Sequence, residues 1–262
     1  MQSIIFFDID GTIMTEDERM IIPESTVSAI AETRRKGNLT FINSGRTAFN
    51  VSERIKSLGF DGFIYGCGTQ IEYNGKVLFH NKLDRNLCRN IAESMRRCRV
   101  TPVYEDSKQY YFDDKAPLTD GLKLFFETFA ANGIDISGRV EDESFQFDKF
   151  VVWDNKNCDM EAFRKEASRD FSVIDRGDDF YEMVPLGFSK ATAIHYILEK
   201  LGIPLDNAYA IGDSANDLPM LEAVPNSIAM GGAERIYPYV SYVTTPIEKD
   251  GIANALKHYG LI

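Results

Sequence analysis

The sequence lacks any hydrophobic run long enough to cross a membrane. A membrane-spanning helix needs roughly 18 to 20 consecutive apolar residues, and every apolar run in this chain is shorter than that. The N-terminus leads directly into a strand-like run and shows no signal-peptide pattern. The sequence therefore predicts a cytoplasmic protein that functions without a membrane.

Positive charge is also in short supply. Lys and Arg number 29 against 40 Asp and Glu, which gives a net charge of −11. Nucleic acids and anionic membranes attract basic surfaces, so we expect neither as a partner. The sequence gives no indication of the oligomeric state.

Cysteine and histidine are few and scattered. Zinc sites need these residues at short, regular spacings such as C-x-x-C, and no such spacing occurs in this chain. We therefore expect no zinc site, and we expect reduced cysteines that serve as structural residues. The residues concerned are Cys67, Cys88, Cys98, Cys158, His80, His195 and His258.

The first motif in the chain is a short apolar run that ends in two carboxylates. Ile4–Phe7 has the continuous apolar character of a strand covered on both faces, and Asp8, Asp10 and Gly11 follow it. Because Asp8 and Asp10 are one residue apart, an extended backbone would direct both to the same side. Two such anions about 4 Å apart repel by roughly 4 kcal/mol, and Mg²⁺ is the cation that suits carboxylates beside a phosphate. An ordinary acidic turn is the alternative.

A second strand, Leu39 to Ile42, runs into Asn43-Ser44-Gly45-Arg46-Thr47. We expect a helix from about Ala48 to Leu58, so that a hydroxyl and backbone N–H groups would lie at a helix N-terminus, where phosphate binds. A plain N-cap formed by Ser44 or Thr47 is the alternative interpretation.

Two later motifs add a cation and more carboxylates. Lys190 lies in the first turn of an amphipathic helix, where a cation opposes the helix dipole unless an anion lies nearby. A strand at Ala208 to Ile211 is followed by Asp213, Asn216 and Asp217. If the strands lie parallel, six side chains meet at one edge of the sheet, those of Asp8, Asp10, Ser44, Lys190, Asp213 and Asp217. Phosphoryl transfer needs such a combination of acidic and basic groups.

The pattern of elements predicts two domains within the 262 residues. Strands and helices alternate over residues 1–82 and again over 185–262, which is typical of a doubly wound parallel sheet. Over residues 83–184 the strands are joined by short turns, which indicates an α+β module with an antiparallel sheet. We therefore expect an α/β protein with a Rossmann-like core and an inserted α+β domain.

The order of D-I-D-G-T, S-G-R, the helix-start Lys and G-D-S-A-N-D resembles the haloacid dehalogenase-like superfamily. A large insertion between the S-G-R strand and Lys190 resembles the Cof-like phosphatases of that superfamily, which carry a type C2 cap. The resemblance extends over nearly the whole chain.

The resemblance implies a role for each residue of these motifs. Asp8 would be the nucleophile that attacks phosphorus, and Asp10 the general acid and base. The phosphate would be bound by Ser44, Gly45, Lys190 and Asn216. Mg²⁺ would be held by Asp8, the backbone carbonyl of Asp10, Asp213 and, as support, Asp217.

Three positions depart from the family pattern. Ser44 stands where Thr is frequent, which keeps the hydroxyl. Cys67 lies in a Gly66-Cys67-Gly68 run where Asn-Gly-Ala is frequent, and Ala191 follows the Lys where Gly is usual. The last two bear on the identity of the substrate rather than on the reaction.

The predicted function is a Mg²⁺-dependent phosphatase that hydrolyses small phosphorylated metabolites through an aspartyl-phosphate. Sugar phosphates, or cofactors such as pyridoxal phosphate and flavin mononucleotide, are the substrates that the resemblance suggests, and the inserted domain would act as a lid. A sugar phosphomutase is the first alternative. A signalling receiver and a catalytically silent binding protein are two others.

Overall fold

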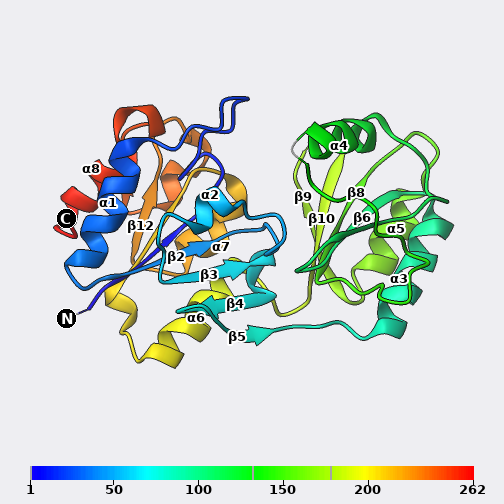
Figure 1. Cartoon of the computed structure of the whole chain (residues 1–262), viewed down its shortest axis with the longest axis horizontal. Helices are drawn as coiled ribbons and strands as arrows, with labels where there is room; N and C mark the ends of the chain where they lie inside the picture. The colour runs from blue at the N-terminus through cyan, green and yellow to red at the C-terminus, as the bar shows by residue number, and fades with distance from the viewer. Residues whose placement is uncertain (1, 132, 178) are drawn as a thin grey trace. The chain divides into compact units, whose positions relative to one another are not determined.

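The computed structural model describes residues 2–131, 133–177 and 179–262. The chain divides into two compact units, which are considered separately (Figure 1). The first comprises the chain up to Arg46, Val51–Phe79 and Phe188–Ile262, and the second comprises Thr47–Asn50 and His80–Gly187. The predicted limits of the inserted domain, 83 and 184, lie inside the second of these ranges.

The first unit is built on an eight-stranded sheet in the order β13-β12-β11-β1-β2-β3-β4-β5. Strands β13 to β3 of this order run parallel, and β4 is antiparallel to β3. The hairpin between β4 and β5 turns at Asn74 and Gly75, both at positive φ, as the Asn-Gly pair predicts. The bounds are β1 Ile4–Phe7, β2 Leu39–Asn43, β3 Gly62–Tyr65, β4 Gln70–Tyr73, β5 Lys76–His80, β11 Ala208–Gly212, β12 Asn226–Ala229 and β13 Tyr242–Val243.

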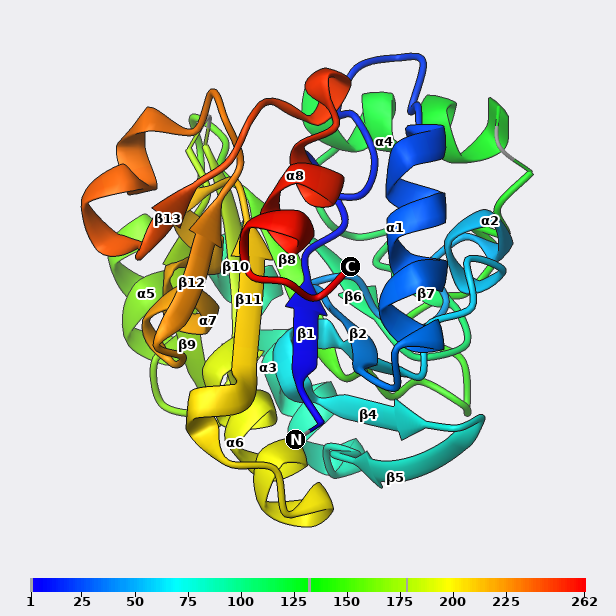
Figure 2. The ribbon, with the colours of Figure 1, turned by 90° about the vertical axis from the view of Figure 1, so that its left-hand side faces the viewer.

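Helices cover both faces of this sheet (Figure 2). On one face α1 (Glu24–Arg35) packs against α8 (Gly251–His258), and on the other α6 (Lys190–Leu201) packs against α7 (Leu218–Glu222). Every residue of β1 is fully buried, because the strand is central and covered on both sides. The predicted doubly wound α/β core is confirmed.

The second unit contains a five-stranded antiparallel sheet in the order β7-β6-β8-β10-β9. Side chains alternate along β8: Phe150 and Val152 join the apolar cluster that includes α3 and α5, whereas Val151 and Trp153 pack with α4. The predicted α+β character is confirmed. The bounds are α3 Arg85–Cys98, β6 Thr101–Glu105, β7 Tyr110–Phe112, α4 Asp120–Ala131, β8 Lys149–Trp153, α5 Met160–Ala167, β9 Phe171–Asp175 and β10 Phe180–Pro185.

The helix expected from Ala48 to Leu58 is wrong over most of its length. Only α2, Glu53–Lys56, is helical, and it follows an extended Ser52. Thr47–Asn50 instead forms a turn, closed by a 2.9 Å hydrogen bond from the Asn50 N–H to the Thr47 carbonyl, and groups with the second unit. Thr, Phe and Asn all rank low in helix propensity, so three of these four residues do not favour a helix.

Five 3₁₀ helices complete the described elements. They are η1 Gly66–Gly68, η2 Leu205–Asn207, η3 Ala215–Asp217, η4 Glu234–Tyr239 and η5 Ile247–Lys249. η1 directly follows β3 and contains Cys67, one of the departures from the family pattern. η3 begins two residues after β11 ends and contains Asn216 and Asp217 of the predicted site.

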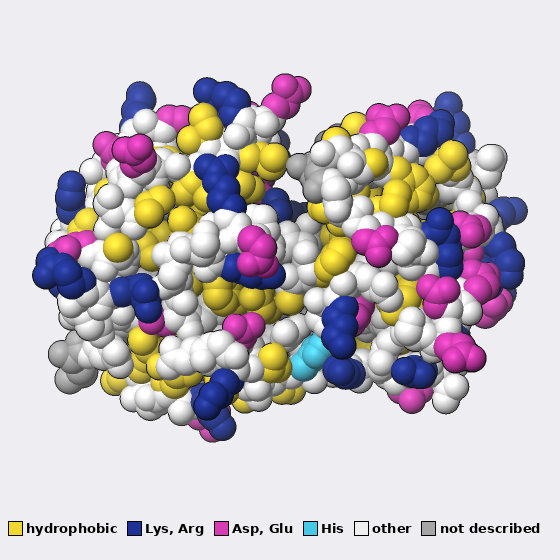
Figure 3. All heavy atoms as spheres, in the orientation of Figure 1, with side chains coloured by type: hydrophobic (Ala, Val, Ile, Leu, Met, Phe, Trp, Pro, Cys, Tyr) yellow, Lys and Arg dark blue, Asp and Glu magenta, His cyan; other side chains and the backbone are white. Residues whose placement is uncertain are grey.

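Three features of the described chain relate to the expectations about membranes, cysteines and charge. No helix within the described residues is long and apolar enough to span a membrane. All four cysteines are free. Acidic and basic side chains are interspersed on the face seen in Figure 3.

Candidate active site

The strand register brings the predicted site residues to one edge of the sheet. Phe7, the last residue of β1, lies opposite Ile42 of β2 on one side and Ile211 of β11 on the other. Asp8 therefore follows at the level where both neighbouring strands end. The chain runs from β1 outward to β2 and β3 in one direction, and β11 and β12 lie in the other. Such a reversal of strand order is where open α/β sheets bind ligands.

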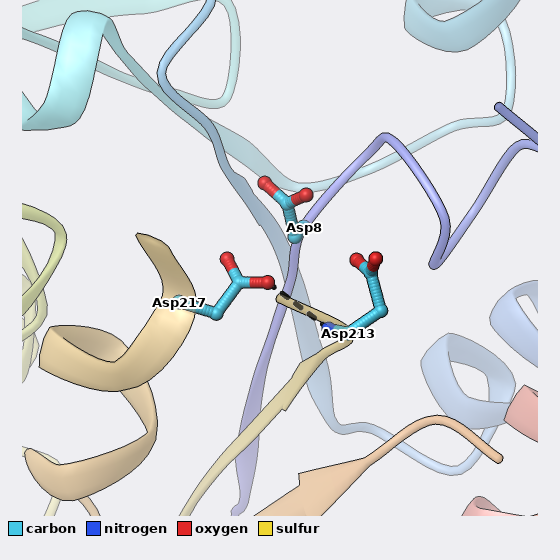
Figure 4. A group of neighbouring side chains, drawn as sticks. All are labelled: Asp8, Asp213 and Asp217. Carbon is cyan, nitrogen blue, oxygen red and sulfur yellow. Dashed lines mark hydrogen bonds between the residues drawn. The ribbon is translucent and has the colours of Figure 1, made fainter. Parts of the chain in front are cut away.

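Three carboxylates meet at this edge. One oxygen from each of Asp8, Asp213 and Asp217 lies within 4.8 Å of the others. Figure 4 shows the three side chains arriving from the end of β1, the end of β11 and the turn behind β11. One Asp217 oxygen, Oδ2, accepts hydrogen bonds from the backbone N–H groups of Asp213 at 3.0 Å and Ser214 at 3.1 Å. Asp217 is thus fixed by the backbone of its own turn.

Lys190 is the cation of this cluster. Its Nζ donates to Oδ1 of Asp8 and to Oδ1 of Asp217, each at 2.5 Å, and its side chain is 2% exposed. Lys190 is the first residue of α6, behind Ser189, whose hydroxyl caps the helix. Three ionised carboxylates and one ammonium leave a formal charge of −2. A divalent cation with oxygen ligands would balance that charge.

The pKa values of the cluster reflect burial and crowding. Burial, followed by the charge of Asp217, raises the pKa of Asp8 to about 7 and that of Asp213 to about 8. Burial opposes the charge on Lys190, but the Asp217 and Asp8 carboxylates outweigh it and raise the pKa of the ammonium above its usual range. Lys190 therefore stays charged, whereas Asp8 and Asp213 gain their full charge only above neutral pH.

Two glycines make this approach of carboxylates possible. Gly11 has φ +70°, and a Cβ there would overlap the Asp213 carboxylate. A Cβ at Gly212 would come within 2.7 Å of the Asp217 side chain. The glycines of the D-I-D-G-T and G-D-S-A-N-D motifs are therefore required by close packing within the site.

Asp10 lies apart from the three buried carboxylates. The chain bends at Ile9, directly after β1, so the extended backbone expected for Asp8 and Asp10 is not present. The Asp10 carboxylate is held by Arg46, with 2.9 Å between Nε and Oδ2 and 2.5 Å between Nη2 and Oδ1. Sequence reasoning assigned no role to Arg46, although it belongs to the S-G-R motif that was used to predict the site.

Ser44 is buried at the end of β2, as predicted, but its surroundings differ from the prediction. No helix starts behind it, since α2 begins only at Glu53, so the expected helix N-terminus is absent. The Ser44 Oγ accepts a 3.2 Å hydrogen bond from the Arg46 N–H across Gly45, and the Ser44 carbonyl accepts one from Cys67 at 3.0 Å. Because its Oγ already accepts a hydrogen bond, the hydroxyl proton of Ser44 can be donated to an anion.

Asn43, for which no role was predicted, contacts the start of α6, whereas Asn216, which was predicted to be a site residue, does not. The fully buried Asn43 donates from Nδ2 to the Lys190 carbonyl at 3.0 Å, which ties the end of β2 to the start of α6. Asn216 was expected to help bind the phosphate. Its side chain instead accepts a hydrogen bond from the Ser214 hydroxyl, and in the described part of the chain it makes no hydrogen bond to Lys190.

Comparison with known proteins identifies the family. The model of the haloacid dehalogenase-like hydrolases matches residues 5–256. YkrA of Bacillus subtilis (strain 168), provisionally named a phosphatase, is 32% identical over 99% of this chain and 98% of its own. YcsE of the same organism, a 5-amino-6-(5-phospho-D-ribitylamino)uracil phosphatase, is 28% identical over 98% of this chain and 96% of its own.

Solved structures agree on the fold. The structure of BT4131, described as a subclass IIB sugar phosphatase of this superfamily, superposes with a TM-score of 0.81 at 24% identity and covers 100% of both chains. The resemblance to the haloacid dehalogenase-like superfamily that the motifs predicted is thus confirmed. The chain is a phosphatase that belongs to the haloacid dehalogenase-like hydrolases.

Proposed function

We propose that this phosphatase is Mg²⁺-dependent and hydrolyses small phosphorylated metabolites through an aspartyl-phosphate on Asp8. The observation that carries the proposal is the Asp8 carboxylate, held at 2.5 Å by the buried Lys190 ammonium at the switch point of the sheet. A nucleophile needs such an oriented position, and the same ammonium can neutralise phosphoryl oxygens.

The proposed reaction uses four side chains, each with its own role: those of Asp8, Lys190, Ser44 and Asp10. A carboxylate oxygen of Asp8 bonds to phosphorus while the bond from phosphorus to the leaving oxygen breaks. Lys190 and the Ser44 hydroxyl would stabilise the negative charge of the transferring group. Asp10 would give its proton to the leaving oxygen and then take one from the water that attacks the aspartyl-phosphate. Inorganic phosphate leaves and Asp8 is restored.

The donor set fits Mg²⁺ in its chemistry. Asp8 and Asp213 offer carboxylate oxygens and Asp10 a backbone carbonyl, whereas both Asp217 oxygens are already engaged by Lys190 and by backbone N–H groups. We assign Asp217 to the support of the other ligands. A bound Mg²⁺ would supply positive charge to the phosphoryl oxygens.

The decisive experiment measures phosphate release from a panel of monoesters, with Mg²⁺ and with EDTA. The panel holds sugar phosphates, pyridoxal phosphate, flavin mononucleotide and a phosphorylated ribitylaminopyrimidine, because two relatives are described as acting on a sugar phosphate and on a ribitylaminouracil phosphate. We expect release that requires Mg²⁺, and the ranking would identify the preferred class of substrate. Isomer formation that depends on a sugar bisphosphate, without phosphate release, would instead support a mutase.

The pKa shifts predict how Mg²⁺ binding depends on pH. Folding raises the pKa of Asp8 to about 7 and of Asp213 to about 8, so the metal-free protein loses stability as pH rises from about 4 to about 8. Mg²⁺ binds the ionised carboxylates, so as the pH falls below these pKa values the affinity for Mg²⁺ should weaken by about tenfold per pH unit for each proton released on binding.

The measurement is the increase in Tm at saturating and at low Mg²⁺ between pH 5.5 and 8.5. We expect the Tm increase at fixed low Mg²⁺ to grow with pH over this range and to flatten above about pH 8. Asp213→Asn removes one of the titrating ligands and should make the dependence shallower. If the Tm increase at low Mg²⁺ were the same at pH 5.5 and at pH 8.5, the assignment of Asp8 and Asp213 as Mg²⁺ ligands would be contradicted.

A further inference from the structure

The second unit contains a cavity of about 260 Å³ that is lined by polar side chains. Three segments of this unit form its walls: the stretch that leads into α3, the turn between β6 and β7, and the loop before β8. Every lining side chain carries a charged or hydrogen-bonding group, and none belongs to a residue of the candidate active site. The cavity is slightly smaller than the usual ligand pocket of about 300–1,000 Å³. It therefore fits a small, polar ligand.

Basic side chains from two of these segments line the cavity. They are Lys82, Arg85 and Lys108, and all three are exposed. Within the described residues, none of the three forms an ion pair with a carboxylate. Arg96 of the same unit, in contrast, pairs with Asp113 at 2.6 Å. Because no carboxylate neutralises them, the three cations around the cavity can bind an anionic ligand.

Two carboxylates also line the cavity, and each is already hydrogen-bonded. Asp106 accepts from the Lys108 backbone N–H at 3.3 Å and from the Ser107 hydroxyl at 3.5 Å, within the turn between β6 and β7. Asp148 is 2% exposed, and its Oδ1 lies 2.8 Å from Nε2 of His80. Three cations and two carboxylates give the lining a formal charge of +1, whereas the whole chain carries −11. The cavity is thus a locally positive site in an acidic protein.

Neutral groups of the lining offer further hydrogen bonds. The Tyr111 hydroxyl donates to the Ser144 carbonyl at 2.9 Å, so its oxygen can accept a hydrogen bond from a ligand. The Gln146 amide donates one N–H to the Leu83 carbonyl and has a second N–H to donate. Donors and acceptors of this kind match the hydroxyl groups of a small carbon skeleton.

We propose that this cavity is a phosphate-binding site of the second unit, in which Lys82, Arg85 and Lys108 hold the phosphate group of a small ligand. A phosphate group carries a charge of about −1.5 to −2 at pH 7 and offers three or more acceptor oxygens. Those oxygens can take hydrogen bonds from ammonium and guanidinium groups on different segments at the same time. A carboxylate, with one charge and two oxygens, uses three cations less fully.

The proposed site goes beyond the proposed function, because none of its residues takes part in that reaction. Two ligands share its chemistry: inorganic phosphate and the phosphate group of a hydroxylated metabolite. Binding measurements separate these two ligands without any turnover, so their result does not depend on the proposed reaction.

The first experiment measures how fast acetic anhydride modifies each lysine of the unaltered chain, read by mass spectrometry at constant ionic strength. We expect saturating inorganic phosphate to slow the modification of Lys82 and Lys108 by about fivefold or more. Lys165, an exposed lysine of α5 outside the cavity, should keep its rate. Ser44→Ala removes a hydroxyl of the candidate active site and should leave the protection unchanged. Equal rates with and without phosphate, or protection that is lost in Ser44→Ala, would overturn the proposal.

The second experiment is a calorimetric titration with inorganic phosphate, glycerol phosphate and glycerol. It uses the Asp8→Asn chain in EDTA, so that no monoester is hydrolysed. Lys108→Met should weaken the binding of both phosphate ligands by about 5- to 20-fold, whereas the matched control Lys165→Met should change it by less than about twofold.

The ranking of the three ligands identifies what the cavity binds. Glycerol phosphate that binds about tenfold more tightly than inorganic phosphate would assign the site to a phosphorylated metabolite, and similar affinities would assign it to free phosphate. Glycerol that binds as tightly as glycerol phosphate, or equal effects of Lys108→Met and Lys165→Met, would overturn the proposal.

Discussion

Replacing Asp8 with Asn is expected to lower kcat for phosphate release by about 10⁵-fold or more, because the amide has no nucleophilic oxygen anion. The fold should tolerate the change. The native site already raises the pKa of Asp8 to about 7 through burial, so it already favours a neutral group at this position. Lys190 would keep its hydrogen bond to Asp217. We therefore expect the urea midpoint to remain the same or to rise.

The control for Asp8→Asn is Asp213→Asn, which neutralises a neighbouring carboxylate and leaves the nucleophile intact. Its activity should recover in excess Mg²⁺, whereas that of Asp8→Asn should not. A phosphorylated form of the unaltered chain, trapped by acid and mapped by mass spectrometry, should be missing from Asp8→Asn. Turnover that persists in Asp8→Asn would mean that the phosphate comes from a contaminating enzyme.

The sequence was sufficient for the part of the site that depends on strand order. Ile4–Phe7 and Ala208–Ile211 are apolar without a break, which identifies central strands, and the parallel order then brings Asp8 and Asp213 to one edge. Lys190 could be included because a cation at a helix start is unfavourable without an anion. These inferences need only periodicity and charge, both of which are local properties of the chain.

The contacts that cross between elements could not be read from the sequence. The hydrogen bond from Asn43 to the Lys190 carbonyl joins residues 147 positions apart. The ion pair of Arg46 with Asp10 depends on the bend at Ile9, which no propensity indicates. The helix predicted over residues 48 to 58 forms only at Glu53–Lys56, and Phe49 lies instead in a turn with its ring against that of Tyr110, a contact that the local sequence does not indicate.

Replacing Lys190 with Met should have the second large effect, on stability as well as on activity. The side chain lies between Asp8 and Asp217, and all three groups are almost fully buried. Without the ammonium, two carboxylates would be buried without their partner, which costs about 3–5 kcal/mol of unfolding free energy. Loss of charge stabilisation should lower kcat by about 10³-fold. Urea unfolding and phosphate release at pH 8 measure the two effects.

The pH dependence of this loss separates charge from packing. Burial raises the pKa of Asp8 to about 7, and the protonated Asp8 carboxyl needs no cation, so the destabilisation of Lys190→Met should be largest near pH 8 and should shrink toward pH 5.5. Lys200→Met, on the exposed last turn of the same helix, should stay within about 0.5 kcal/mol at both pH values. In an Asp217→Asn background, Lys190→Met should cost less than it does alone, because one of the two buried charges is already gone. A cost that is independent of both pH and Asp217 would assign the effect to the lost volume of the side chain, and Lys190 would then be a packing residue rather than the counter-ion of the nucleophile.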